Sequence, residues 1–223
     1  MNKALFIRAI SRFAAGVLLV GGLLFIPAGT WNYPQGRLLM GILFVPMFAA
    51  GLVMMKINPE LLKKRLNVKE EESEQRTVIL FSGIMFLMAF IAAGLSFRYG
   101  WLMLPFPVSV AAAVVFLAAY ALYAEVLREN TYLSRTVEVQ ENQKVIDTGL
   151  YGLVRHPMYM ATVFLFLAMP LVLGSVISFL IMLAYIPIIT KRIRNEEQVL
   201  AEGLPGYREY MEKVRYRLIP FVW

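Results

Sequence analysis

Residues 157–195 read PMYMATVFLFLAMPLVLGSVISFLIMLAYIPIITKRIRN and decide the fold class of this chain. The stretch holds two apolar runs, at about 157–173 and 176–195, separated by the turn-forming pair Gly174-Ser175. Runs of roughly twenty apolar residues can cross the ~30 Å hydrocarbon core of a bilayer. Backbone groups in lipid must be satisfied within their own segment, so each run is predicted to be a helix, and the two helices to form a tight hairpin.

Four more apolar runs precede this hairpin, at about 9–28, 36–56, 77–97 and 101–127. The chain is 59% hydrophobic with a mean hydropathy of +0.64, whereas soluble domains are about half apolar. We therefore predict an all-α, polytopic membrane helix bundle of about six transmembrane helices. The fifth run is short for a full crossing. Residues 1–124 and 125–223 are expected to form one integrated membrane domain.

The basic residues predict the orientation of the bundle. Twenty of the 22 Lys and Arg residues fall in segments that the six runs place on one side, and only Arg37 and Arg98 fall on the other. Cytoplasmic loops carry the excess of Lys and Arg, so both termini are predicted to be cytoplasmic. The membrane is expected to be the inner membrane in a bacterium or the endoplasmic reticulum in a eukaryote. A net charge of +7 then reflects this bias and predicts no nucleic-acid partner.

Metal sites and several enzyme classes are disfavoured by composition. The chain has no cysteine and a single histidine, His156, so no metal site is expected. It has neither a dinucleotide-binding glycine fingerprint nor a phosphate-binding glycine loop. Ionisable residues are missing from the middle of the predicted spans, which argues against an ion transporter.

The sequence DTGLYGLVRHPMY, from Asp147 to Tyr159, leads into the fifth run. Proline keeps the residue before it out of the helical region and suits the first helical position, so His156 should be extended and Pro157 should begin the helix. The free amides of that first turn attract anions, and Arg155 adds a fork suited to a carboxylate. The alternative is that Arg155 and His156 only anchor a helix end at the interface.

A doubled acid, Glu196-Glu197, follows the sixth run. Arg192 lies four residues before Glu196 and could pair with it on the helix surface. Neighbouring helical residues point about 100° apart, so the other carboxylate could face inward, where it could contact ribose hydroxyls or a sulfonium-bearing ligand. Tyr207 and Tyr210 follow, and they could form an interfacial aromatic belt or the wall of a pocket.

The order Thr148-Gly149-x-Tyr151, Arg155-His156-Pro157-x-Tyr159, helical hairpin, Glu196-Glu197, Tyr207, Tyr210, Arg217 and Pro220 resembles the isoprenylcysteine carboxyl methyltransferase family. More broadly it resembles the membrane methyltransferases that include the phospholipid methyltransferases. The resemblance covers roughly residues 125–223 and implies a cytoplasmic pocket for S-adenosylmethionine. It implies that Arg155 and Glu196 lie at the methyl-transfer point. It also implies that the cofactor is bound by Thr148, Gly149, Leu150, Tyr151, His156, Pro157, Tyr159, Glu197 and Tyr207.

The predicted function is methyl transfer to a lipophilic acceptor that comes from the bilayer, with a carboxylate as the first choice. An amine or phospholipid acceptor, methylated on nitrogen, is the alternative. A related reductase with a nicotinamide cofactor and a membrane scaffold without activity are the remaining hypotheses. No prenyl-cysteine-reading motif is identified before Asn130, so the acceptor itself is left open.

Overall fold

The structure, a computed structural model, describes residues 3–66, 73–130, 132–133 and 139–223. Within these ranges the chain is helical and contains no strand. The elements are α1 (Lys3–Ala28), α2 (Pro34–Ile57), α3 (Pro59–Leu66), α4 (Ser73–Tyr99), α5 (Phe106–Glu129), a short 3-10 turn η1 (Gly149–Gly152), α6 (Pro157–Val172), α7 (Val176–Met182), α8 (Tyr185–Gly203) and α9 (Tyr207–Lys213).

Long apolar helices dominate the bundle, as predicted. α1, α2, α4 and α5 are each long and apolar enough to cross a membrane, and so is the α7–α8 segment taken as one. α6 is apolar but has only 16 residues, which fits the short fifth run expected from the sequence. The predicted all-α membrane bundle is confirmed. α3 lies in the charged connector between the second and third long helices.

The turn between α6 and α7 forms at Gly174-Ser175, where the sequence places it. Gly174 has φ +70°, a conformation that glycine adopts without steric cost. The hydroxyl of Ser175 accepts a hydrogen bond of 3.1 Å from the amide of Ser178 and so caps α7. The amide of Leu104, in the α4–α5 connection, donates to the carbonyl of Gly174 over 2.8 Å. The hairpin is thereby fixed to the neighbouring loop.

The last span is broken into α7 and α8 at Leu183 and Ala184. Pro187 has no amide proton to give to the carbonyl of Leu183, four residues earlier, and its ring crowds that carbonyl. The break therefore lies where the proline predicts it. Pro170, by contrast, sits two residues before the end of α6 and leaves the helix intact.

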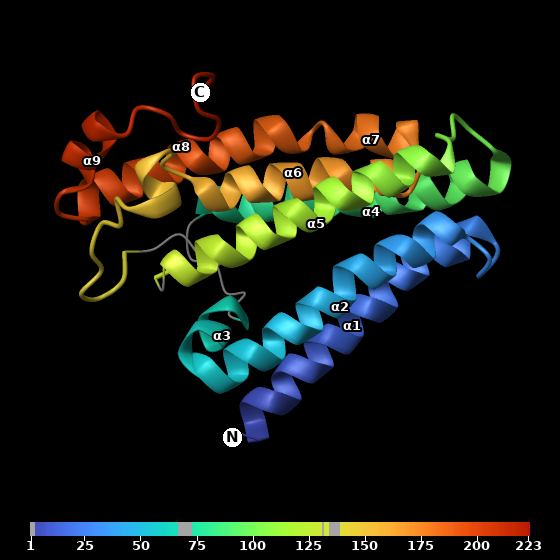
Figure 1. Ribbon diagram of the computed structural model, residues 1–223, viewed down its shortest axis with the longest axis horizontal. Coiled ribbons are helices and arrows are strands. Elements are labelled where there is room, and N and C mark those ends of the chain that lie inside the picture. Colours follow the sequence, from blue (N-terminus) through green and yellow to red (C-terminus); the bar gives the residue numbers. More distant parts are fainter. Residues whose placement is uncertain (1–2, 67–72, 131, 134–138) are drawn as a thin grey trace.

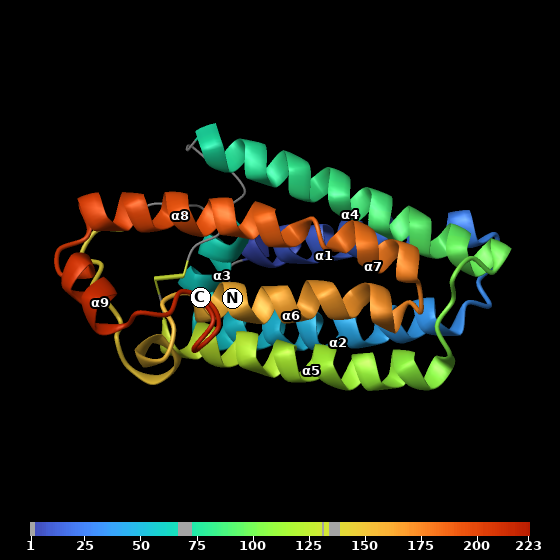
Figure 2. The same cartoon turned by 90° about the horizontal axis from the view of Figure 1, so that it is seen from above.

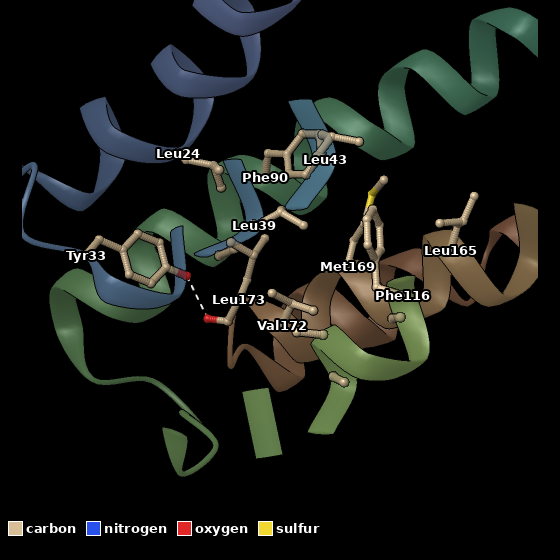
Figure 3. Packing of buried hydrophobic residues seen from close by; sticks show 14 of the residues in the cluster. Leu24, Tyr33, Leu39, Leu43, Phe90, Phe116, Leu165, Met169, Val172 and Leu173 are labelled. Atoms are coloured by element: carbon tan, nitrogen blue, oxygen red, sulfur yellow. Dashed lines mark hydrogen bonds between the residues drawn. The ribbon is translucent and has the colours of Figure 1, made fainter. Parts of the chain in front are cut away.

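One apolar core joins the N-terminal helices to α6. Leu24, Leu39, Phe90 and Phe116, from α1, α2, α4 and α5, pack with the buried residues at the end of α6 (Figure 3). The hydroxyl of Tyr33 donates to the carbonyl of Leu173 over 2.7 Å. At the opposite end of the bundle, η1 and α9 gather around the start of α6 and the end of α8 (Figures 1 and 2). This core includes no described residue of η1, α8 or α9. The candidate site lies at this second end.

Candidate active site

The start of α6 is held against the C-terminal segment by two backbone hydrogen bonds. The amide of Arg155 donates to the carbonyl of Tyr216 over 2.9 Å, and the amide of His156 donates to that of Arg217 over 2.8 Å. His156 is extended, with φ −126° and ψ 62°, and α6 begins at Pro157, as the proline predicts. Residues about sixty positions apart in the sequence are thus side by side.

Glu197 lies buried at the centre of a cluster of basic side chains. Its Oε1 is 3.2 Å from Nε2 of His156 and 2.8 Å from Nε of Arg155, and its Oε2 is 2.7 Å from Nε of Arg217. The Arg155 contact is an ion pair rather than an aligned hydrogen bond, because that Nε–H has no well-directed acceptor. A carboxylate can only accept, so the Nε2 of His156 donates. A buried charge needs such partners to be tolerated.

Glu196 occupies a different environment from its neighbour. The hydroxyl of Tyr159 donates to Oε2 of Glu196 and accepts a 2.8 Å hydrogen bond from Nε of Arg192. The guanidinium of Arg192 also lies 5.8 Å from the centre of the Tyr159 ring. Tyr159 therefore joins the acid on α8 to a cation on the same helix. The suggestion that the two adjacent acids face different ways agrees with these contacts.

A cavity with an empty volume of about 810 Å³, partly open to solvent, lies between the start of α6, α8, α9 and the loop before η1. Glu196 lines it, and so do six other residues that the sequence singles out: Tyr151, Arg155, His156, Tyr159, Tyr207 and Tyr210. The lining does not include five further residues that were predicted to contact the cofactor: Thr148, Gly149, Leu150, Pro157 and Glu197.

Gly149 and Leu150 support the cavity from behind. The amide of Leu150 donates to Oε2 of Glu129 over 3.0 Å. Gly149 has φ +55°, and a Cβ placed on it would lie 1.9 Å from Oε1 of the same carboxylate. The close approach of Glu129 therefore requires glycine here. It fixes η1, whose Tyr151 then reaches the cavity.

Tyr207 brings an unpaired donor to the cavity wall. Its side chain is 5% exposed, and its hydroxyl has no hydrogen-bond partner. Burial raises the pKa of this phenol, and the charges of Glu196 and Glu197 raise it further, so the hydroxyl keeps its proton at neutral pH. A buried donor without an acceptor is rare and costly. A ligand in the cavity that accepts this hydrogen bond would remove that cost.

Tyr207 and Tyr210 are both buried, so neither belongs to an exposed aromatic belt. The hydroxyl of Tyr210 donates to the carbonyl of Tyr151 over 2.7 Å. Nδ2 of Asn130 donates to the hydroxyl of Tyr151 over 3.0 Å. Tyr151 is therefore fixed at both its backbone and its side chain, which gives the cavity a rigid aromatic wall.

Comparisons with known proteins bear on the fold of this chain. The isoprenylcysteine carboxyl methyltransferase (ICMT) family matches residues 109–202. The solved structure of a eukaryotic intramembrane Ras methyltransferase, ICMT, superposes with a TM-score of 0.61, at 19% identity, over 96% of this chain and 77% of that one. The chain therefore resembles the ICMT family over this stretch and is similar to the solved enzyme in fold. The matched stretch begins inside α5 and ends inside α8, and it carries most of the cavity.

A second relative belongs to another enzyme class. Delta(14)-sterol reductase TM7SF2 of Mus musculus is 29% identical over 91 residues. The match covers 40% of this chain and only 22% of that protein. This partial match is an observation in favour of the reductase hypothesis of the sequence analysis.

The cavity of this ICMT-like chain also contains residues that sequence reasoning missed. Arg192, Leu200 and Leu204 of the α8 side line it with Glu196, and their spacing of four is a helical stripe that the pattern could have revealed. No periodicity points to the remaining ones, most of which come from the irregular loop: Asn130, Tyr132, Leu133, Gln143, Lys144, Val145, Ile146 and Met158.

The charges around the cavity favour an anionic group. Lys144, Arg155 and Arg192 line it on the basic side, whereas Glu196 is the one acid among the described lining residues. Glu197 partly neutralises Arg155 from behind. The balance remains positive, which fits the anion site expected before α6.

Proposed function

We propose that this chain is an integral membrane methyltransferase that uses S-adenosylmethionine and acts on a lipophilic acceptor, with a carboxylate as the first choice. The ICMT family match and the ICMT-like fold support a membrane methyltransferase. The observation that carries the proposal is the cavity that joins Arg155, His156, Tyr159, Glu196 and Tyr207. The residues that the family resemblance associates with methyl transfer and cofactor binding thus line one cavity.

The cavity fits the cofactor by its donors, acceptors and aromatic rings. The unpaired hydroxyl of Tyr207 suits an acceptor atom of a nucleoside or a carboxylate. Glu196 offers a carboxylate for hydroxyls or for a positively charged sulfur. Tyr151 and Tyr159 provide flat apolar walls. These four residues, with His156, would hold S-adenosylmethionine, whose sulfonium-bound methyl group supplies the electrophile when it is bound.

Thr148, Gly149, Leu150, Pro157 and Glu197 are proposed to act through neighbours, since they do not line the cavity. Oε1 of Glu197 accepts a 3.2 Å hydrogen bond from Nε2 of His156 and thereby fixes the imidazole. Gly149 and Leu150 fix η1 through Glu129. Pro157 sets the start of α6. These contacts make the wall of the cofactor pocket rigid. Holding the reactants in position is the main contribution of a protein to a displacement reaction.

Arg155 is placed to orient the acceptor. Its Nη1 donates to the carbonyl of Met211 over 3.2 Å, and its Nε lies against Glu197, so the guanidinium is held at the cavity wall. A planar fork in this position suits the carboxylate of an acceptor. An ionised carboxylate needs no general base, and exclusion of water would then complete the chain's contribution.

Met158 adds an apolar side chain to the cavity lining. It lines the cavity from the first turn of α6 and lies 3.9 Å, measured from its sulfur, from Nη1 of Arg65 in α3. The guanidinium of Arg65 also lies 5.5 Å from the ring centre of Tyr123 in α5. We place the entry of the lipophilic acceptor near this contact, where α3, α5 and α6 meet.

An amine acceptor is the second candidate, because a proton must then leave and Glu196 lines the cavity. Glu196 would take that proton as a general base. Lipid mass spectrometry of cells with and without the gene separates the two. Accumulation of an unmethylated carboxylate supports the first candidate, and loss of an N-methylated lipid supports the second.

The decisive experiment is calorimetry of the detergent-purified chain with S-adenosylhomocysteine, with NADPH as the competing ligand. Saturable binding is expected, and Tyr207→Phe should weaken it by about 1–2 kcal/mol because one hydrogen bond is lost. Tyr216→Phe, at a half-exposed position outside the cavity lining, is the matched control. Binding of NADPH without S-adenosylhomocysteine binding would replace this proposal with the reductase.

A further inference from the structure

A groove runs between α4 and α8 and continues along the surface of α8. We call it the α4–α8 groove and define it by Val78, Phe81, Pro187, Ile188, Lys191 and Arg194. It consists of two adjoining hollows that share Pro187 and Lys191, and the one between the helices has an empty volume of about 450 Å³, partly open to solvent.

This groove is separate from the candidate active site. The cavity is lined by Arg192, Glu196 and Leu200 of α8, whereas the groove uses Lys191 and Arg194. Each residue turns the helix by about 100°, so Arg194 points some 200° away from Arg192. α8 therefore presents one polar face to the cavity and a second, basic face to the groove.

The groove lies where both helices change from apolar to charged. On α4 the sequence is apolar from Val78 onward, directly after Arg76 and Thr77. On α8 it is apolar through Ile189 and charged from Lys191. Such changes occur at the boundary between acyl chains and headgroups. Phe81 is 57% exposed on the apolar side of this boundary.

The lining of the groove is basic at one end and apolar at the other. Among the residues described there, none is acidic, and Lys191 and Arg194 supply two positive charges. Val78, Phe81 and Ile188 form the apolar part. A ligand that fits must carry a negative group next to a hydrocarbon chain. Basic hollows between transmembrane helices bind acidic lipid headgroups for this reason.

We infer that the α4–α8 groove is a binding site for an anionic phospholipid. Lys191 and Arg194 bind the headgroup phosphate, the guanidinium of Arg194 contributing two parallel donors. One acyl chain lies along Phe81 and Ile188. The bound lipid holds the outer face of α8, whose inner face carries Arg192 and Glu196. This site does not depend on the methyltransferase activity.

The test uses delipidated full-length protein in neutral detergent and fluorescent phosphatidylglycerol, with phosphatidylcholine as the uncharged comparison. We expect saturable binding of phosphatidylglycerol that the double variant Lys191→Gln/Arg194→Gln weakens roughly tenfold. The matched control is Lys56→Gln/Lys63→Gln, which removes two exposed charges outside the groove and should leave the affinity unchanged. Equal loss in both variants would mean unspecific charge attraction and would overturn the site.

A second arm tests the acyl chain. Phe81→Ala should weaken the binding of phosphatidylglycerol severalfold while all the charges remain. Soluble glycerol phosphate should compete poorly, because it lacks the chain. Full competition by glycerol phosphate, or an unchanged affinity of both Phe81→Ala and the double variant, would contradict a lipid site in this groove.

Discussion

Glu196 and Glu197 are chemically identical neighbours with different surroundings. Glu197 is 6% exposed and held by three basic side chains, whereas Glu196 is half-buried at the cavity wall beside Tyr159. The rotation of about 100° between successive helical residues separates them. Loss of Glu197 should therefore affect mainly stability, and loss of Glu196 mainly ligand binding.

We expect Glu197→Ala to lower the free energy of unfolding by about 3–5 kcal/mol, because Arg155, His156 and Arg217 would lose their shared buried partner. Thermal unfolding in detergent measures the effect. Glu212→Ala, at an exposed position on α9, is the control and should change little. A Glu197→Ala protein as stable as the control would contradict the central place of this carboxylate.

Gly149→Ala should destabilise the η1 turn. The added Cβ meets the carboxylate of Glu129, and the left-handed backbone at φ +55° disfavours any side chain. We expect a loss of about 2 kcal/mol in unfolding free energy and weaker binding of S-adenosylhomocysteine through displacement of Tyr151. Gly83→Ala, which meets open space on α4, should lower neither quantity, because alanine is the better helix former. Wild-type stability of Gly149→Ala would show that Glu129 can move aside freely.

At the scale of elements, the break between α7 and α8 sets the direction of the helix that carries Arg192 and Glu196. α8 starts two residues before Pro187, and the interruption falls where the proline removes the helical amide donor to the carbonyl of Leu183. That carbonyl accepts from the amide of Ile186 over 3.1 Å instead. An unbroken helix would continue along the axis of α7. Pro187 therefore helps to position the cavity residues that α8 carries.

Pro187→Ala should restore the missing amide and allow α7 and α8 to join. We expect the affinity for S-adenosylhomocysteine to fall about tenfold, because α8 would shift relative to α6 and small displacements of positioning groups have large effects. Calorimetry measures it. Pro170→Ala, in a helix that its proline does not break, should retain the wild-type affinity. If both variants bound S-adenosylhomocysteine with the same affinity, the helix break would not control the geometry of the site.

At the scale of the whole molecule, the two ends of the bundle have different compositions. α3 and α9 lie at one end, and the α6–α7 turn with the α4–α5 connection lies at the other (Figures 1 and 2). The cavity is lined in part by α9, so it belongs to the first end. Arg37 and Arg98, the basic residues assigned to the far side, belong to α2 and α4 near that second end. We propose on the positive-inside rule that the cavity end is cytoplasmic.

The absence of cysteine allows this orientation to be tested with single introduced thiols. Asn32→Cys lies between α1 and α2, and Glu202→Cys lies near the end of α8; both positions are exposed. In intact cells an impermeant maleimide should label the first and reach the second only after the membrane is opened. The reverse pattern would invert the proposed orientation.

Much of the bundle could be read from local patterns. The apolar runs, the turn at Gly174-Ser175 and the helix start at Pro157 depend on neighbouring residues only, and they agree with the structure. The residues of the candidate site were harder to predict from the sequence. Tyr132 and Lys144 line the cavity but belong to an irregular loop, where no period marks the residues that turn inward.

The sequence by itself determined the positions of the apolar helices, their hairpin and the resemblance to the ICMT family, because hydropathy, proline and glycine act over a few residues. Only the tertiary structure decided which of the twin acids is buried and which faces the cavity. That choice depends on Arg155, His156 and Arg217, two of which precede Glu197 by some forty residues and one of which follows it by twenty. Contacts across such separations depend on the packing of the whole chain, which sequence patterns do not record.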